Sequence, residues 1–261
     1  MVEHSPDIIR VMTYNIHSGV NRDGNIRLQP VVQVIRELNP DIVALQEVDM
    51  GITHRRYRHQ AKVLSERLEM EFFFFPLVQF ETRHYGLAFL SRRPFTVVKC
   101  DRLPTVLPRF RLQKRGAVWI RLNHLPRPTH IFNTHLGLFH RERRRQVEAL
   151  LGKNWLEAVP RDEAVVLCGD LNAGPLSWTY RNLSASLSDV QKKRGGRQRP
   201  KPTFSSRRPI LRIDHIFVSH HLASVSVKVP TSRITQMASD HLPLSAELHF
   251  NPQRGRRLTA L

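Results

Sequence analysis

The segment VVLCGDLNAGP, residues 165–175, joins an apolar run to two polar side chains. Its apolar part, Val165–Cys168, predicts a buried strand. The two-residue period of a strand places Asp170 and Asn172 on one face and turns Leu171 toward the core. A carboxylate beside an amide can orient a water molecule and hydrogen-bond to a phosphoryl oxygen, but Asp and Asn also favour plain turns. The segment alone leaves both interpretations open.

Glycine and proline residues indicate where this strand ends and what lies close to it. Gly169 has no side chain, so it predicts a close approach of backbone or ligand beside Asp170. Gly174 and Pro175 predict that the strand is broken shortly afterwards. The polar pair is therefore expected at the end of the strand, where strands deliver side chains to functional sites.

Strand-like and helix-like segments alternate on both sides of this segment. Buried strands are expected at Ile8–Tyr14, Ile42–Leu45, Phe72–Phe75, Leu87–Leu90, Thr96–Cys100, Ala117–Leu122, His130–Asn133, Ala164–Cys168, Ile213–Val218 and Leu244–Phe250. Helices are expected at Leu28–Leu38, Gln60–Leu68 and Arg141–Val159. Many strands mixed with helices in one chain of 261 residues predict α/β layers with two packed sheets.

The charge of the chain is strongly positive. Forty-one lysines and arginines against 22 acidic residues give a formal net charge of +19. Nucleic acid or the anionic face of a membrane is the expected partner, and a merely solvated basic surface is the alternative. Residues 1–250 are expected to form a single domain. Residues 191–201 (QKKRGGRQRPK) predict a basic flexible loop, and residues 251–261 predict a basic flexible tail.

Two cysteines are too few for a disulfide framework or a cysteine zinc site. Cys100 and Cys168 stand beside apolar residues and are expected in the core. The N-terminal stretch lacks a basic segment followed by an apolar one, and no apolar run approaches the ~20 residues that span a bilayer. We therefore expect a cytoplasmic protein with no transmembrane segment, whose contact with any membrane is peripheral.

Two more polar residues end apolar runs. Asn15 closes VMTYN and Glu47 closes VALQE. A hard cation such as Mg²⁺ prefers oxygen ligands, commonly one or two carboxylates with water and substrate phosphate. The pair would suit such a cation, although each residue alone also fits a turn or a cap.

Aspartate and histidine occur together in the C-terminal third of the chain. Asp214 stands in the apolar run RIDHIFVS, where a lone carboxylate is costly unless it is paired or bound to a metal. ASDHLPLSAEL offers His241 as its partner, because a hydrogen-bonded Asp makes an imidazole a better general base. Asp240 is a further candidate metal ligand. His135, which follows the strand in IFNTHLGLFH, could protonate a leaving oxygen or stabilise charge on a phosphoryl group.

These segments occur together and in a fixed order. The motifs TYNIHSG, LQEVD, NTHLGL, GDLNAGP, RIDHIFVS and SDHLPL extend from Thr13 to Leu244. In these motifs the chain resembles the endonuclease/exonuclease/phosphatase superfamily, whose members include type I deoxyribonucleases, apurinic endonucleases, neutral sphingomyelinases and inositol polyphosphate phosphatases. The resemblance implies a four-layered α/β sandwich: two packed mixed β-sheets flanked by helices, with the site at one edge.

The resemblance also implies roles for the polar residues that it covers. Asn15 and Glu47 would bind a divalent cation, Mg²⁺ or Mn²⁺, with help from Asp240. Asp170 would position or activate the attacking water, and Asn172 would hold the phosphoryl group.

The remaining implied roles concern the base and the substrate. Asp214 would orient His241 as the general base. His135 matches the histidine of the deoxyribonuclease, sphingomyelinase and inositol phosphatase branches; apurinic endonucleases lack it, which disfavours a repair role of that kind. Arg115, in KRGAVWI, matches a pattern of the bacterial branch and is expected to contact phosphate.

The sequence thus predicts a metal-dependent phosphoesterase that cleaves a phosphodiester with a metal-activated water. Nucleic acid and phospholipid are both open as the source of the anionic phosphate-ester substrate. A catalytically inactive basic protein that binds polyanions and keeps the fold is the alternative from another class of function.

Overall fold

The computed structural model of the chain describes residues 7–20, 24–53, 56–80, 83–106, 114–192 and 199–251. Most of the basic loop expected at 191–201 and nearly all of the tail expected at 251–261 lie outside these residues. The flexible loop, the flexible tail and the domain boundary at residue 250 therefore stay predictions.

One β-sheet holds seven strands in the described part of the chain. Along the sheet these are β12 (Leu222–Lys228), β13 (Leu244–Phe250), β1 (Ile8–Asn15), β2 (Ile42–Thr53), β5 (Arg83–Ser91) and β4 (Glu71–Phe80), with β3 (Arg56–His59) paired to β2. β1 and β2 run parallel and the other pairs run antiparallel, so the sheet is mixed.

The second sheet holds six strands within the described residues. Their order is β10 (Ser188–Asp189), β11 (Asp214–Val218), β9 (Ala164–Asp170), β8 (Thr129–His135), β7 (Gly116–Leu122) and β6 (Thr96–Arg102). Only β8 and β9 are parallel among these pairs, so this sheet is mixed as well.

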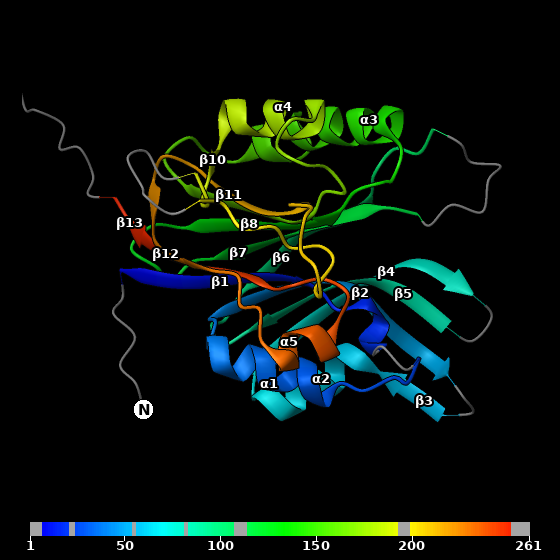
Figure 1. The fold of residues 1–261 in the computed structure, drawn as a ribbon. Coiled ribbons are helices and arrows are strands. Elements are labelled where there is room, and N and C mark those ends of the chain that lie inside the picture. Colours follow the sequence, from blue (N-terminus) through cyan, green and yellow to red (C-terminus); the bar gives the residue numbers. More distant parts are fainter. Residues whose placement is uncertain are drawn as a thin grey trace, which may run out of the picture.

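Helices cover the outer face of each sheet (Figure 1). α1 (Gln29–Leu38), α2 (Gln60–Leu68) and α5 (Arg233–Ala238) lie against the first sheet. α3 (His140–Leu151) and α4 (Trp178–Ser186) lie against the second. The order helix, sheet, sheet, helix confirms the predicted four-layered α/β sandwich.

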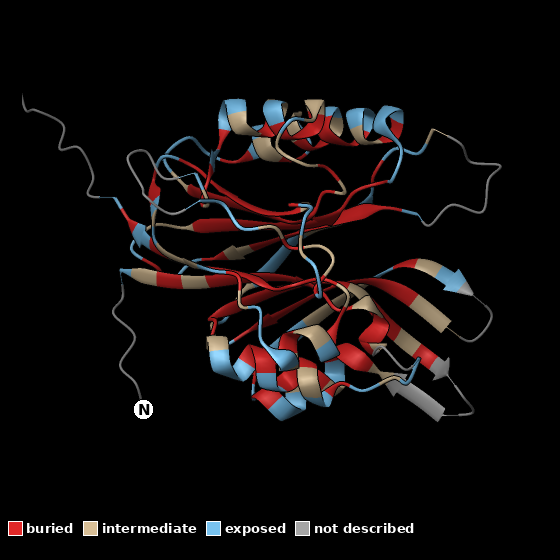
Figure 2. Cartoon of the chain, in the orientation of Figure 1, coloured by how far each residue is buried: buried red, intermediate tan, exposed pale blue. Residues whose placement is uncertain are grey.

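The core explains why the central strands are continuous apolar runs. Val11 of the first sheet packs in one buried cluster with Ile131 and Val166 of the second. The next side chain along β1, Met12, points the other way and packs with Ile35 of α1. Strands buried on both faces lose the usual alternation of apolar and polar residues. Figure 2 shows the result as buried residues throughout both sheets.

The helix expected at Arg141–Val159 is too long. α3 ends at Leu151, and a separate 3₁₀ turn, η2 (Leu156–Ala158), follows. Gly152 is the C-cap with an extended backbone, and glycine is a poor helix former. After this break Trp155 turns back to pack in the apolar cluster beneath α3 and α4. Trp155 and Val159 are therefore buried without continuing the helix.

The phenylalanine run also differs from its prediction as a core strand. It belongs to β4, which lies at the edge of the first sheet. Phe73 and Phe75 are only partly buried against the core, and Phe72 is exposed. A run of four phenylalanines has no period, so the sequence alone could not separate an edge strand from a central one.

Four strand ends carry the predicted site to one edge of the sandwich. Asn15 is the last residue of β1 and lies opposite Gln46 of the parallel strand β2. In the second sheet, His135 and Asp170 end the parallel strands β8 and β9 in register. Asp214 begins the antiparallel strand β11 directly opposite Asp170. The polar ends of four strands therefore share one edge.

Candidate active site

Asp170 is held at this edge by the glycine before it. Gly169 has φ +144°, and a Cβ there would lie 1.9 Å from the carbonyl oxygen of Thr134 on β8. Only glycine allows this close pairing of β8 with β9. The Asp170 side chain is buried, and its Oδ1 accepts the backbone N–H of Asn172 at 2.9 Å. Of the two uses predicted for Gly169, close approach of backbone or of a ligand, the structure shows the approach of backbone.

Asn172 lies beyond the end of β9 in a turn. Its φ is +48°, and Leu171 between it and Asp170 is fully buried. The Asn172 Nδ2 donates to the carbonyl of Leu136 at 2.9 Å and lies 3.1 Å from Nε2 of His135. The turn interpretation of this segment is confirmed, and the turn brings Asn172 beside His135, as the site interpretation requires.

Asp214 and His241 form a buried pair. His241 Nδ1 lies 2.9 Å from Asp214 Oδ2, and the other ring nitrogen lies 3.7 Å from Asp170 Oδ2. A charged Asp214 accepts the Nδ1 proton, so Nε2 is the nitrogen left to face Asp170. Burial lowers the pKa of His241, but the charge and hydrogen bond of Asp214 outweigh it and raise the pKa to about 10. The surrounding carboxylates thus stabilise the protonated imidazole.

Glu47 does not end its strand, contrary to expectation. β2 continues to Thr53, and Glu47 lies in a bulge where the pairing with β5 shifts between Leu45 and Val48. Its φ is +57°, a left-handed conformation that is costly for a residue with a side chain. The bulge turns the carboxylate toward Asn15, which is a common use of bulges beside active sites.

Asn15 joins the two sheets at the site. Its Nδ2 donates to Glu47 Oε1 and to Asp170 Oδ2, each at 3.0 Å. Its Oδ1 accepts the backbone N–H of His17 at 3.0 Å. In this arrangement Asn15 orients two carboxylates, and its oxygen has one lone pair left for the predicted metal.

His17 is a site residue that the sequence did not single out. Its Nδ1 lies 3.5 Å from Glu47 Oε2 and 3.6 Å from Asp240 Oδ1. The hydrogen bond with Glu47 raises the pKa of His17 despite partial burial. With 14 histidines in the chain, the one available signal was its position two residues after Asn15.

Arg115 fixes the protonation of His135. Its Nη1 lies 3.0 Å from Nδ1 of His135, and both side chains are buried. A guanidinium only donates, so Nδ1 accepts and Nε2 carries the proton. That Nε2–H lies 3.4 Å from Asp170 Oδ2. Burial and the charge of Arg115 hold the pKa of His135 well below its usual value, so this ring is a neutral donor.

The carboxylates of the site differ in their affinity for protons. Burial and the charge of Asp214 raise the pKa of Asp170. Burial also raises the pKa of Glu47, but hydrogen bonds from His17 and Asn15 outweigh it and lower the pKa to about 2. Glu47 is therefore ionised, while Asp170 gives up its proton less readily than an ordinary aspartate.

This donor set fits a divalent cation. Asp170, Asp214 and His241 each offer a ligand atom, and these atoms lie within 4.8 Å of one another. Asp214 Oδ1 is buried and has no hydrogen-bond partner among the described residues. A buried lone pair without a donor, surrounded by carboxylates, is where a hard cation binds favourably. The compact cluster comprises residues predicted to be catalytic, whereas the predicted ligands Asn15, Glu47 and Asp240 lie beside it.

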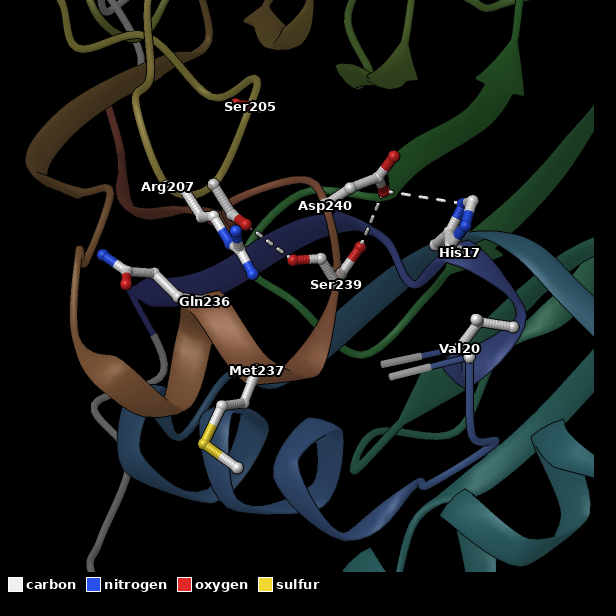
Figure 3. A pocket seen from close by; sticks show the side chains of 10 residues that line it. His17, Val20, Ser205, Arg207, Gln236, Met237, Ser239 and Asp240 are labelled. Atoms are coloured by element: carbon white, nitrogen blue, oxygen red, sulfur yellow. Dashed lines mark hydrogen bonds and ion pairs between the residues drawn. The ribbon is translucent and has the colours of Figure 1, made fainter. Parts of the chain in front are cut away.

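A pocket of about 480 Å³ opens next to this cluster. His17 and Asp240 form its boundary with the site, and Ser239 donates to Asp240 at 3.3 Å (Figure 3). Gln236 and Met237 of α5 line another side, and Arg207 faces it from the loop before β11; Val20, Gly24, Ser205 and Ser206 complete the lining. The pocket offers hydroxyls, an amide and a cation to a ligand beside the cluster.

Two packed mixed sheets with a buried aspartate–histidine cluster at one edge define the class of this protein as an α/β sandwich with a hydrolase-like site. The chain belongs to the Endonuclease/Exonuclease/phosphatase family, whose model matches residues 12–241. Members of this family are generally metal-dependent phosphoesterases. The uncharacterized protein YbhP of Escherichia coli K12 is 30% identical to this chain over 259 residues, covering 92% of this chain and 96% of YbhP.

Solved structures share the fold. The endonuclease/exonuclease/phosphatase of Beutenbergia cavernae superposes with a TM-score of 0.74 at 23% identity, covering 94% of this chain and 72% of that one. The mannosyl-6-phosphatase of Bacteroides thetaiotaomicron superposes with a TM-score of 0.72 at 21% identity, covering 93% and 100%. At these identities the likeness establishes the fold and no particular substrate.

Proposed function

We propose that this protein is a phosphodiesterase that uses Mg²⁺ or Mn²⁺ and attacks its substrate with water. The observation that carries the proposal is the buried cluster of Asp170, Asp214 and His241, joined to Glu47 through Asn15. A divalent cation held by Asn15, Glu47 and Asp240, as the sequence predicts, or by the carboxylates of Asp170 and Asp214, would supply positive charge to the phosphoryl oxygens and leave Nε2 of His241 free.

The pair of His241 and Asp214 acts as the base. His241 Nδ1 donates to Asp214, so Nε2 is the nitrogen that would accept the proton of the attacking water once a bound cation has displaced the proton that the carboxylates hold on this imidazole. Asp214 keeps the ring oriented and stabilises the imidazolium that forms. Asp170, 3.7 Å from Nε2, holds the water in line with that nitrogen.

The phosphoryl group is bound by neutral donors. His135 Nε2–H and Asn172 Nδ2 lie together at the edge of the site and can donate to phosphoryl oxygens as charge develops. A neutral His135 stabilises this charge by hydrogen bonding and is not the acid that protonates the leaving oxygen. Arg115 acts through His135 by fixing its tautomer, and the phosphate contact expected of Arg115 from the sequence stays a prediction.

Substrate and location belong to the same proposal. The net charge of +19 supports a polyanionic substrate, either nucleic acid or phospholipid. The cysteines Cys100 and Cys168 are both free, which fits the reducing cytoplasm. No helix among the described residues has the length and apolarity to cross a bilayer.

The proposal is tested by hydrolysis assays with Mg²⁺ and with Mn²⁺. Bis-p-nitrophenyl phosphate is the diester probe and p-nitrophenyl phosphate the monoester probe, beside plasmid DNA, phosphatidylinositol and sphingomyelin. We expect wild type to cleave the diester and His241→Ala to lose at least about 100-fold in rate, because general bases contribute on this scale. His249→Ala, an exposed histidine on β13, is the matched control and should retain the wild-type rate.

The results separate the candidate functions. Cleavage of the diester by wild type and by His249→Ala, with the expected loss in His241→Ala, supports the proposal. Cleavage of the monoester alone would replace it with a phosphatase. Polyanion binding without turnover of any substrate would favour the inactive binding protein.

A further inference from the structure

Several exposed apolar side chains lie in the loops that adjoin the polar strand ends of the site. Leu176 is 91% exposed, Ile210 is 82% exposed and Leu138 is 63% exposed, and Phe139 and Leu211 are half exposed. Exposed aliphatic side chains cost free energy in water, so a group of them indicates a surface that is covered by a partner. We call Leu138, Phe139, Leu176 and Ile210 the apolar rim.

The rim residues come from three neighbouring loops. Leu138 and Phe139 lie between β8 and α3, Leu176 between β9 and α4, and Ile210 in the loop before β11. Hydrogen bonds join these loops. Asn172 Nδ2 donates to the carbonyl oxygen of Leu136, and the backbone N–H of Leu171 donates to the carbonyl oxygen of Ile213. His215 Nε2 also lies 2.9 Å from the carbonyl oxygen of Ala173. The loops that carry the rim are therefore joined to one another beside the end of β9, where Asp170 stands.

Exposed arginines flank the rim in the sequence. Arg141 and Arg145 follow Phe139 in the first turns of α3 (LFHRERRR). Arg207 and Arg208 precede Ile210 in the same way (RRPIL). Apolar side chains with cations beside them match an anionic bilayer, because the apolar groups enter the interface while the cations remain with the lipid headgroups.

We propose that the apolar rim and its arginines dock on an anionic lipid bilayer and present the catalytic cluster to a phospholipid headgroup. This inference rests on the proposed function, since it names the source of the phosphodiester. Duplex nucleic acid is the weaker occupant: it is bound mainly through its phosphates, which do not cover exposed leucine and isoleucine side chains.

Other exposed apolar residues provide a matched control. Val97 and Val98 lie on β6, the last strand of the second sheet, and Val225 lies on β12, the last strand of the first. Val97 pairs with Ile120, four residues along β7 from Gly116. Val225 follows Ser224, the residue of β12 that pairs with Leu248 near the far end of β13. Serine at these positions removes the same kind of surface without touching the rim.

The experiment is co-sedimentation with vesicles of phosphatidylcholine alone or mixed with phosphatidylglycerol. The rim variant is Leu138→Ser with Leu176→Ser and Ile210→Ser, and the control variant is Val97→Ser with Val98→Ser and Val225→Ser. We expect wild type and control to bind mixed vesicles, and the rim variant to bind about tenfold or more weakly, because each lost side chain removes buried apolar area. Thermal melting verifies that both variants are folded.

Three results would overturn the bilayer proposal: no binding of wild type to mixed vesicles, equal binding of the rim variant, or equal loss in the control variant. Retention of duplex DNA that depends on the rim would assign the surface to nucleic acid instead. Vesicle binding is measured without turnover, so its failure is distinct from failure of the proposed function, which shows as no hydrolysis of soluble bis-p-nitrophenyl phosphate.

Discussion

Asp214 illustrates how one buried residue defines the chemistry of this site. One of its oxygens accepts from His241, and the other has no donor among the described residues. A carboxylate in this state is stabilised by positive charge, which is either the imidazolium of His241 or a cation. Proton and metal therefore compete for the same cluster.

This competition predicts a pH-dependent stability in EDTA. The pKa of His241 is raised from 6.5 to about 10, chiefly by Asp214 against the effect of burial. A raised pKa in the folded state contributes stability that is complete below about pH 6.5 and is lost as pH rises to about 10. We expect the free energy of unfolding of wild type to fall between about pH 8 and about pH 10 more steeply than that of His241→Asn. Denaturant titrations across this range measure both slopes; equal slopes would contradict the assignment.

Single residues also show the limits of sequence-based prediction. The sequence singles out Asn15, Asp170 and Asp214 because a polar residue that ends or interrupts an apolar run needs a partner. The bulge at Glu47 could not be predicted, since left-handed backbone at a glutamate arises from tertiary packing and leaves no pattern in the sequence. His17 was missed because its role depends on two carboxylates from elsewhere in the chain, Glu47 and Asp240.

At the scale of elements, the site depends on how closely β9 approaches β8. The pairing is parallel and in register from Thr129 to His135, and Gly169 lies against the backbone of Thr134. Any displacement of β9 would move Asp170 away from His135 and Asn15. The catalytic geometry therefore depends on a residue without a side chain.

Gly169→Ala should accordingly destabilise the fold. The new Cβ would lie 1.9 Å from a backbone oxygen, at a φ of +144° that alanine rarely adopts. We expect a loss of about 3 kcal/mol or more in the free energy of unfolding. Gly152→Ala is the control, because its Cβ would meet neighbours at 3.4 Å or more, and it should change stability by less than about 1 kcal/mol. Chemical denaturation compares the two, and similar losses would refute the steric argument.

Most central elements follow from the sequence, and the peripheral ones do not. The helix Gln60–Leu68 and the strand Leu244–Phe250 have the predicted bounds, because apolar spacing determines buried elements. α5 has six residues, too few to show a helical period, and the edge strand β12 is half exposed, so neither was predicted. Their position depends on the neighbours against which they pack.

At the scale of the whole molecule, an acidic cluster lies in a strongly basic protein. The net charge of +19 favours a polyanion, but Glu47, Asp170, Asp214 and Asp240 stand where the proposed function places its phosphate. Phosphate and carboxylates repel one another unless a cation lies between them. The central claim is therefore that this protein hydrolyses phosphodiesters only with a divalent cation in its site.

The most direct test is the rate of bis-p-nitrophenyl phosphate hydrolysis by wild type after treatment with EDTA, followed by titration with Mn²⁺. We predict a rate at least about 100-fold lower in EDTA, restored by the metal in a saturable manner, since a bound cation contributes several kcal/mol to transition-state stabilisation. Asp214→Asn should not be restored at the same Mn²⁺ concentration. Undiminished hydrolysis in EDTA would contradict the account.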